Sequence, residues 1–164
     1  MYPNEFKKTM YEVVKQFKGL STIRPKVNAQ KISPSKAISY YTSMNGLMLD
    51  NVISIAKLSD DAKITKALTA YSSFLLSKER AGIERAIGSN TLISDHFGKG
   101  MREKLNNLIS AQNSFMKTFQ YYATSEAQTF YKKTVSGKPV EEVIRIRNIM
   151  LNAREIGGFN VKSK

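Results

Sequence analysis

Residues 78–86 (KERAGIERA) combine charged side chains with very small ones. This segment holds the side chains best suited to binding chemistry. Steps of three and four residues continue an apolar helical stripe onto Glu79 and Gly82, so both are expected to face inward. Gly82 costs a helix interior roughly 1 kcal/mol relative to alanine, and it leaves a small surface that a helix or a ligand can approach. Arg85 lies at the edge of that surface, where a guanidinium can bind a planar anion through two parallel hydrogen bonds.

Three polar residues stand where the helical pattern calls for a hydrophobic one: Asn45, Glu79 and Gln112. A buried charge needs a partner, and a buried amide needs its hydrogen bonds completed. Two interpretations stay open: a polar layer that sets helix register, or a polar pocket that receives a small ligand. Arg147 is among the cations available to such a pocket. Arg80 and Glu84 are expected to pair with each other on the exposed face.

Catalytic constellations are missing from the sequence. His96 is the only histidine and there is no cysteine, which excludes a multi-histidine metal site, thiolate zinc sites and cysteine nucleophiles within one chain. No phosphate-binding loop, nucleophile elbow or zinc-protease motif occurs. Asp95 and His96 are expected to be surface residues of a loop. We therefore expect a binding domain with no cofactor and no metal, and not an enzyme.

The net charge of +13, from 26 basic and 13 acidic residues, favours a partner with negative charge. The lysines are dispersed, without a basic run or a recognisable reading motif, which argues against nucleic acid. No stretch approaches the roughly 18 apolar residues that cross a bilayer, and the N-terminus lacks the apolar region of a signal peptide. We expect a chain that is soluble as given, with any membrane-spanning part of its parent protein outside it.

Helical periodicity dominates the sequence, and strand-like alternation does not persist. Gly19 is expected to stop the first helix, residues 20–33 to form a connector broken at Pro25, and residues 88–100 to form a second break. Long helices with short connectors predict an all-α fold, an antiparallel up-and-down bundle resembling a four-helix bundle, with about six helices. The expected helices cover residues 3–18, 34–58, 59–87, 101–123, 125–133 and 139–154.

Five blocks of the sequence resemble the nitrate- and nitrite-sensing (NIT) domain of bacterial receptors, in the family's order and at similar spacing. The match is closest to versions in methyl-accepting chemotaxis proteins, and KE-x-AG-x-ERA is its most specific part. The blocks are residues 40–56 (YYTSMNGLMLDNVISIA), 70–90 (AYSSFLLSKERAGIERAIGSN), 96–101 (HFGKGM), 111–119 (AQNSFMKTF) and 143–151 (VIRIRNIML).

The resemblance implies a sensor outside the cytoplasmic membrane, a periplasmic or extracytoplasmic part of an inner-membrane protein that usually forms a homodimer. It implies nitrate or nitrite as the ligand, held by arginines, one of them in an ER motif that corresponds to Arg85. Gln112 and Arg147 match recurrent family positions. The family's earlier helix with its own ER motif has no counterpart here. Residues 1–164 are therefore expected to form a single helical sensor domain from a larger sensor, with the resemblance centred on residues 37–155.

The first interpretation is thus the ligand-sensing domain of a bacterial chemoreceptor or related signal-transduction protein. Its candidate ligand-binding residues are Arg85, Glu79, Gly82, Gln112 and Arg147. A second interpretation is a structural or protein-interaction bundle, in which the polar layer sets only register and dimer contacts. A third, a basic nucleic-acid-binding bundle, predicts affinity that falls steeply with salt.

Overall fold

The computed structural model describes residues 3–153 and 157–161, and within them every regular element is a helix. The all-α class with about six helices is confirmed. The chain forms two compact units, Met1–Ser72 and Ser73–Lys164. The helices are α1 (Asn4–Asn28), α2 (Pro34–Lys57), α3 (Ala62–Ser94), α4 (Met101–Tyr122), α5 (Ser125–Thr134) and α6 (Lys138–Asn152).

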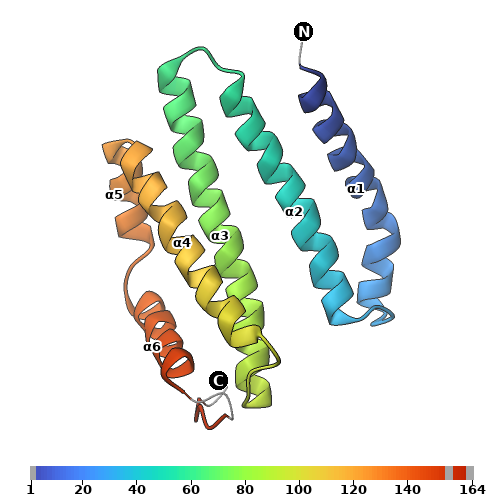
Figure 1. Ribbon diagram of the computed structural model, residues 1–164, viewed down its shortest axis with the longest axis vertical. Helices are drawn as coiled ribbons and strands as arrows, with labels where there is room; N and C mark the ends of the chain where they lie inside the picture. Colours follow the sequence, from blue (N-terminus) through green and yellow to red (C-terminus); the bar gives the residue numbers. More distant parts are fainter. Residues whose placement is uncertain (1–2, 154–156, 162–164) are drawn as a thin grey trace. The chain divides into compact units, whose positions relative to one another are not determined.

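In the first unit, α1 and α2 pack against each other as a helical hairpin (Figure 1). The expected stop at Gly19 is wrong, because α1 continues to Asn28 with Pro25 inside it. Gly19 instead permits a close approach: a Cβ there would lie 2.6 Å from the Tyr40 hydroxyl oxygen. That hydroxyl donates a hydrogen bond to the backbone carbonyl of Gln16. Pro25 has no backbone N–H, so one hydrogen bond of the helix is missing at this position. Its ring fixes φ near the helical value, and the helix continues past it.

The sequence predicts helix caps at Ser33, at residues 59–61 and at Ser125. Ser33 caps α2, accepting a hydrogen bond from the backbone N–H of Lys36 at 3.4 Å, and a proline follows at the first helical position. Asp61 accepts bonds from the N–H groups of Lys63 and Ile64 at 2.7 and 3.3 Å, which begins α3. At α5 the cap is Thr124, one residue before the predicted Ser125.

The expected break at residues 88–100 is wrong for its first seven residues, because α3 continues to Ser94. Gly88 is buried, and a Cβ there would lie 3.4 Å from the Cε of Met150 in α6. The glycine therefore lets α6 approach α3 closely, and it does not end the helix. The left-handed φ of Asp95, 52°, follows directly after the helix.

The core of the second unit lies where α3, α4 and α6 meet. Leu105 of α4 is 0% exposed, and it clusters with Phe97, Met150 and Phe159. Helical spacing predicts an inward face of α4 at Leu105, Leu108, Gln112, Phe115 and Phe119; four of these are buried, and Phe115 is half-buried. α6 ends at Asn152, and its expected end at Arg154 lies outside the described residues. This core holds α6 against α3, which positions the groups described next.

Asp95 also ties the segment after α6 to the end of α3. Its carboxylate accepts hydrogen bonds from the backbone N–H groups of Gly158 and Phe159, both at 3.0 Å. The ring of Phe159 meets that of Phe97 edge-on, with centroids 5.5 Å apart. His96 is exposed, as expected.

Candidate functional site

The buried stripe of α3 in the second unit is made of small and polar residues. It consists of Ser73, Ser77, Glu84, Gly88 and Thr91, at helical spacing. The expected inward face was wrong here: Gly82 and Ala86 are exposed, and Glu79 is half-buried. The apolar stripe of the first half of α3 does not continue, and a stripe of serines, a glycine and a carboxylate takes its place. A prediction based on hydrophobic periodicity cannot detect such a stripe.

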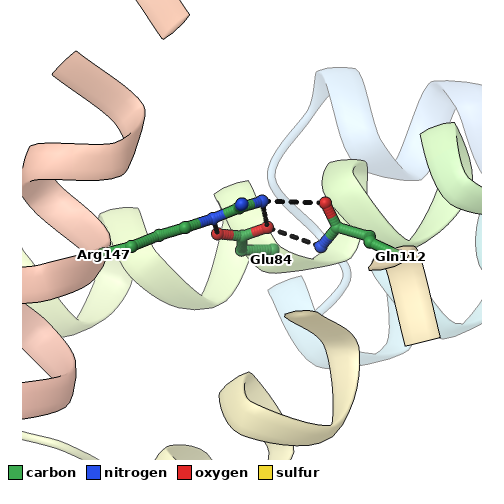
Figure 2. A network of polar contacts seen from close by, with 3 residues as sticks. All are labelled: Glu84, Gln112 and Arg147. Atoms are coloured by element: carbon green, nitrogen blue, oxygen red, sulfur yellow. Dashed lines mark hydrogen bonds and ion pairs between the residues drawn. The ribbon is translucent and has the colours of Figure 1, made fainter. Parts of the chain in front are cut away.

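Glu84, Gln112 and Arg147 form one network that joins α3, α4 and α6 (Figure 2). Arg147 donates from Nε and Nη2 to the two carboxylate oxygens of Glu84 at 2.5 and 2.6 Å, and from Nη2 to Oε1 of Gln112 at 2.8 Å. Gln112 donates from Nε2 to Glu84 at 2.6 Å. The expected pairing of Arg80 with Glu84 is therefore wrong. Arg80 instead lies over the ring of Phe115, 6.0 Å from its centroid.

The network leaves part of Arg147 available. A guanidinium has five N–H donors, and the bonds of Arg147 use only Nε and Nη2, so Nη1 makes no hydrogen bond within the described residues. Its side chain is 24% exposed, against 8% for Glu84. Glu84 and Gln112 therefore fix the orientation of a guanidinium whose outer edge can still donate to a ligand.

A cavity of about 490 Å³ opens between α3 and α6 beside this network. Its charged lining consists of Lys78, Arg85 and Arg147, with Glu84 as the opposing carboxylate. Arg85 is exposed and has no hydrogen-bond or ion-pair partner in the described part of the chain. Three cations against one anion leave an excess of positive charge, which favours an anionic ligand.

The candidate residues chosen from sequence separate into three groups. Arg85, Gly82 and Arg147 line the cavity, and Gln112, which is not among the lining residues, accepts a hydrogen bond from Arg147. Glu79 is not among the lining residues. Sequence reasoning counted Lys78 among the available cations without selecting it as a ligand-binding residue, and it placed Glu84 on the exposed face. The serine spacing before Glu84 was the available signal, because Ser77 and Glu84 are seven residues apart and share a helix face.

Residues 3–153 and 157–161 contain no group of three or more histidine, cysteine or acidic side chains that could hold a metal ion. None of their helices has the length and apolar character needed to cross a membrane.

Comparisons with known proteins identify the family of the chain. The chain is 25% identical over 128 residues to a nitrate regulatory protein of Klebsiella oxytoca. That alignment covers 77% of this chain and 32% of the relative, so the chain spans about a third of the relative's length. No solved structure matches the chain significantly. The family model described as nitrate and nitrite sensing (NIT) matches residues 2–163, and the chain therefore belongs to this family of sensing domains in signal transduction.

Proposed function

We propose that residues 1–164 form one sensing domain of a bacterial signalling protein, and that nitrate or nitrite binds at the cationic wall of the α3–α6 cavity. The observation that carries the proposal is Arg85, an arginine without a partner in the described chain that faces the same cavity as Arg147. A planar oxyanion can accept two hydrogen bonds from one guanidinium and a third from another. The Nη1 group of Arg147 is available for that third bond.

Glu84 and Gln112 have a supporting role in this site. They hold Arg147 through three side-chain bonds, so its outer donors are oriented before the ligand arrives. A ligand that meets a fixed donor loses less free energy to side-chain ordering than one that must immobilise a mobile arginine. Because the described chain offers Glu84 two hydrogen-bonding side chains, its negative charge is largely compensated and does not repel the anion.

Signalling follows from the position of the anion between two helices. Arg85 belongs to α3 and Arg147 to α6, so an anion that bridges them favours the arrangement with the shorter separation. A ligand shifts a conformational equilibrium only through unequal affinity for its two states. We expect the two states to differ in the position of α6 along α3. Ligand binding would then displace α6, and the displacement would be transmitted to whatever follows α6 in the parent protein.

The cellular context rests on the family resemblance and on the relative's name. The family resemblance supports an extracytoplasmic domain of a dimeric inner-membrane receptor, such as a chemoreceptor. The relative's name supports a regulatory protein that responds to nitrate. Detection of flanking membrane spans and a methyl-accepting module in the full gene would support the receptor over the regulator.

Isothermal titration of nitrate and nitrite into the full chain tests the ligand assignment. Arg85→Ala should weaken binding at least tenfold, because it removes a charge-assisted pair of hydrogen bonds. Arg145→Ala is the matched control, because Arg145 is exposed on α6, pairs with Glu142 and does not line the cavity. Binding heat that is unchanged in Arg85→Ala, or lost equally in both variants, would contradict the site.

The second candidate is a protein-interaction bundle without a small ligand. It is favoured by aromatic side chains on the second unit that remain in solvent, with Tyr121 82% and Phe130 71% exposed. Sedimentation equilibrium on wild type and on Tyr121→Ser/Phe130→Ser would test it. A dimer that dissociates in the double variant, together with no heat from any oxyanion, would favour this candidate.

A further inference from the structure

The cavity is much larger than the ligand of the proposed function. An inorganic oxyanion of three or four atoms fills about the volume of two water molecules, roughly 60 Å³, whereas the cavity measures about 490 Å³. Cavities of this size normally enclose an organic molecule with an apolar body. An oxyanion at Arg85 would therefore leave most of the cavity to water.

The register of α6 on α3 sets the order of cationic and apolar groups along the cavity. Glu84 pairs with Arg147, and Gly88 lies against Met150, so the two helices run in the same direction (Figure 1). On α3 the cations Lys78 and Arg85 precede the apolar Leu92. On α6 the apolar residues Val143 and Ile146 precede Arg147, and Met150 follows it, so apolar lining lies on both sides of the Arg147 guanidinium.

The apolar lining comes from both helices. It includes Gly88 and Leu92 of α3 with Val143, Ile146 and Met150 of α6, and Ser89 is the uncharged polar residue beside them. Leu92 follows Arg85 by seven residues, which is about 10 Å along a helix. Apolar surface of this kind gains free energy when an apolar group covers it.

We propose that this cavity binds an organic monocarboxylate with a linear apolar body. The carboxylate accepts hydrogen bonds from Arg85 and from Nη1 of Arg147, with Lys78 adding a third positive charge. The body lies along the apolar lining and covers Leu92, Ile146 and Met150. The inference uses the same cationic wall as the proposed function, but it does not require that nitrate binds.

Charge separates this occupant from the alternatives. Lys78, Arg85 and Arg147 outnumber the single carboxylate of Glu84, so a neutral apolar molecule would leave a net positive charge without a counter-charge, and an apolar cation would be repelled. A carboxylate balances this charge while its body covers the apolar lining. Complementarity in both charge and apolar surface therefore selects an amphipathic anion.

Calorimetric titration of straight-chain carboxylates into the full chain tests the proposal, with acetate, butanoate, hexanoate and octanoate each below its micellar concentration. Affinity should rise along the series by up to about fourfold per buried methylene. Octylammonium, which has the same body and the opposite charge, should bind at least tenfold more weakly than octanoate. Equal affinities for acetate and octanoate, or equal affinities for octanoate and octylammonium, would overturn the inference.

Three variants locate the binding. Arg85→Gln should lower octanoate affinity at least fivefold, and Arg145→Gln should leave it unchanged. Gly82→Leu should also lower it, since Gly82 lines the cavity and a Cβ there meets nothing within 4 Å, so the added side chain enters the cavity without strain. Circular dichroism at 222 nm confirms that each variant is folded. Octanoate affinity that is unchanged in both cavity variants would refute the assignment to this cavity.

The two proposals fail separately. Nitrate binding without any gain along the carboxylate series would leave the proposed function standing and refute the amphipathic ligand. Binding of octanoate but not of nitrate or nitrite would refute the inorganic ligand and support the organic one. Competition between nitrate and octanoate would show that both use the cationic wall.

Discussion

The network of Glu84, Gln112 and Arg147 allows a sharp prediction about stability. We consider Glu84→Leu, Arg147→Met and the double variant, which keep most of the side-chain volume and remove charge. Removing one partner of a buried ion pair costs about 3–5 kcal/mol, whereas replacing both by apolar side chains is often neutral. The double variant should therefore be more stable than either single variant.

Exposure of the two side chains sets the order of the single variants. The Glu84 side chain is 8% exposed and that of Arg147 is 24% exposed. Arg147→Met leaves the more buried charge with only the Gln112 amide, so it should cost about 3–4 kcal/mol. Glu84→Leu leaves a guanidinium that can still reach water and Gln112, so about 2 kcal/mol is expected. The double variant should cost about 1 kcal/mol, for the Gln112 amide that loses an acceptor.

Urea unfolding followed by circular dichroism at 222 nm measures these differences, with midpoints compared at equal denaturant slope. Hydrogen exchange at the Leu105 amide reports the second unit alone, because that residue lies at the centre of its core. Arg145→Met is the control. Arg145 is exposed, and although hydrogen bonds to Glu142 raise its pKa above the usual value, its removal should not change stability measurably.

A double variant that is less stable than both single variants would refute the reasoning. That result would mean that the ion pair itself contributes more than its desolvation costs. Equal costs for the two single variants would refute the argument from exposure.

Two other contacts give predictions of their own. Asp95→Ala should increase hydrogen exchange at the amides of Gly158 and Phe159 at least tenfold, because it removes the carboxylate that accepts hydrogen bonds from both. Unchanged exchange would mean that the packing of the Phe97 and Phe159 rings alone holds this segment. Gly19→Ala should lower the urea midpoint despite the better helix propensity of alanine, because its Cβ would force the Tyr40 hydroxyl to move. Tyr40→Phe in the Gly19→Ala background should recover part of that loss, and a stabilising Gly19→Ala would contradict the close approach.

Local sequence features predicted the elements well wherever the stabilising partner is near in the chain. The cap at Ser33 and the start of α3 at Asp61 need only a backbone N–H two or three residues away. The buried face of α4 was also predicted correctly, since its stripe is apolar. The expectation of an anionic ligand rests on the charge of the chain and on Arg85, and the family assignment followed from residue order along the chain.

Glycine positions were misread for a specific reason. Gly19 and Gly88 look like helix ends in the sequence, but both lie inside helices where another element approaches. A local sequence pattern cannot distinguish a glycine that ends a helix from a glycine that permits a close contact. Only the position of Tyr40 or Met150 distinguishes them, and neither is near in sequence.

The sequence by itself determined that this chain is helical, basic and without cysteine, because these properties depend on composition and on contacts within a few residues. The tertiary structure decided which face of α3 is buried and which residue partners Arg147. Glu84 lies 28 residues from Gln112 and 63 from Arg147. Its burial in a stripe of serines and glycine becomes favourable only when α4 and α6 bring those two side chains to it.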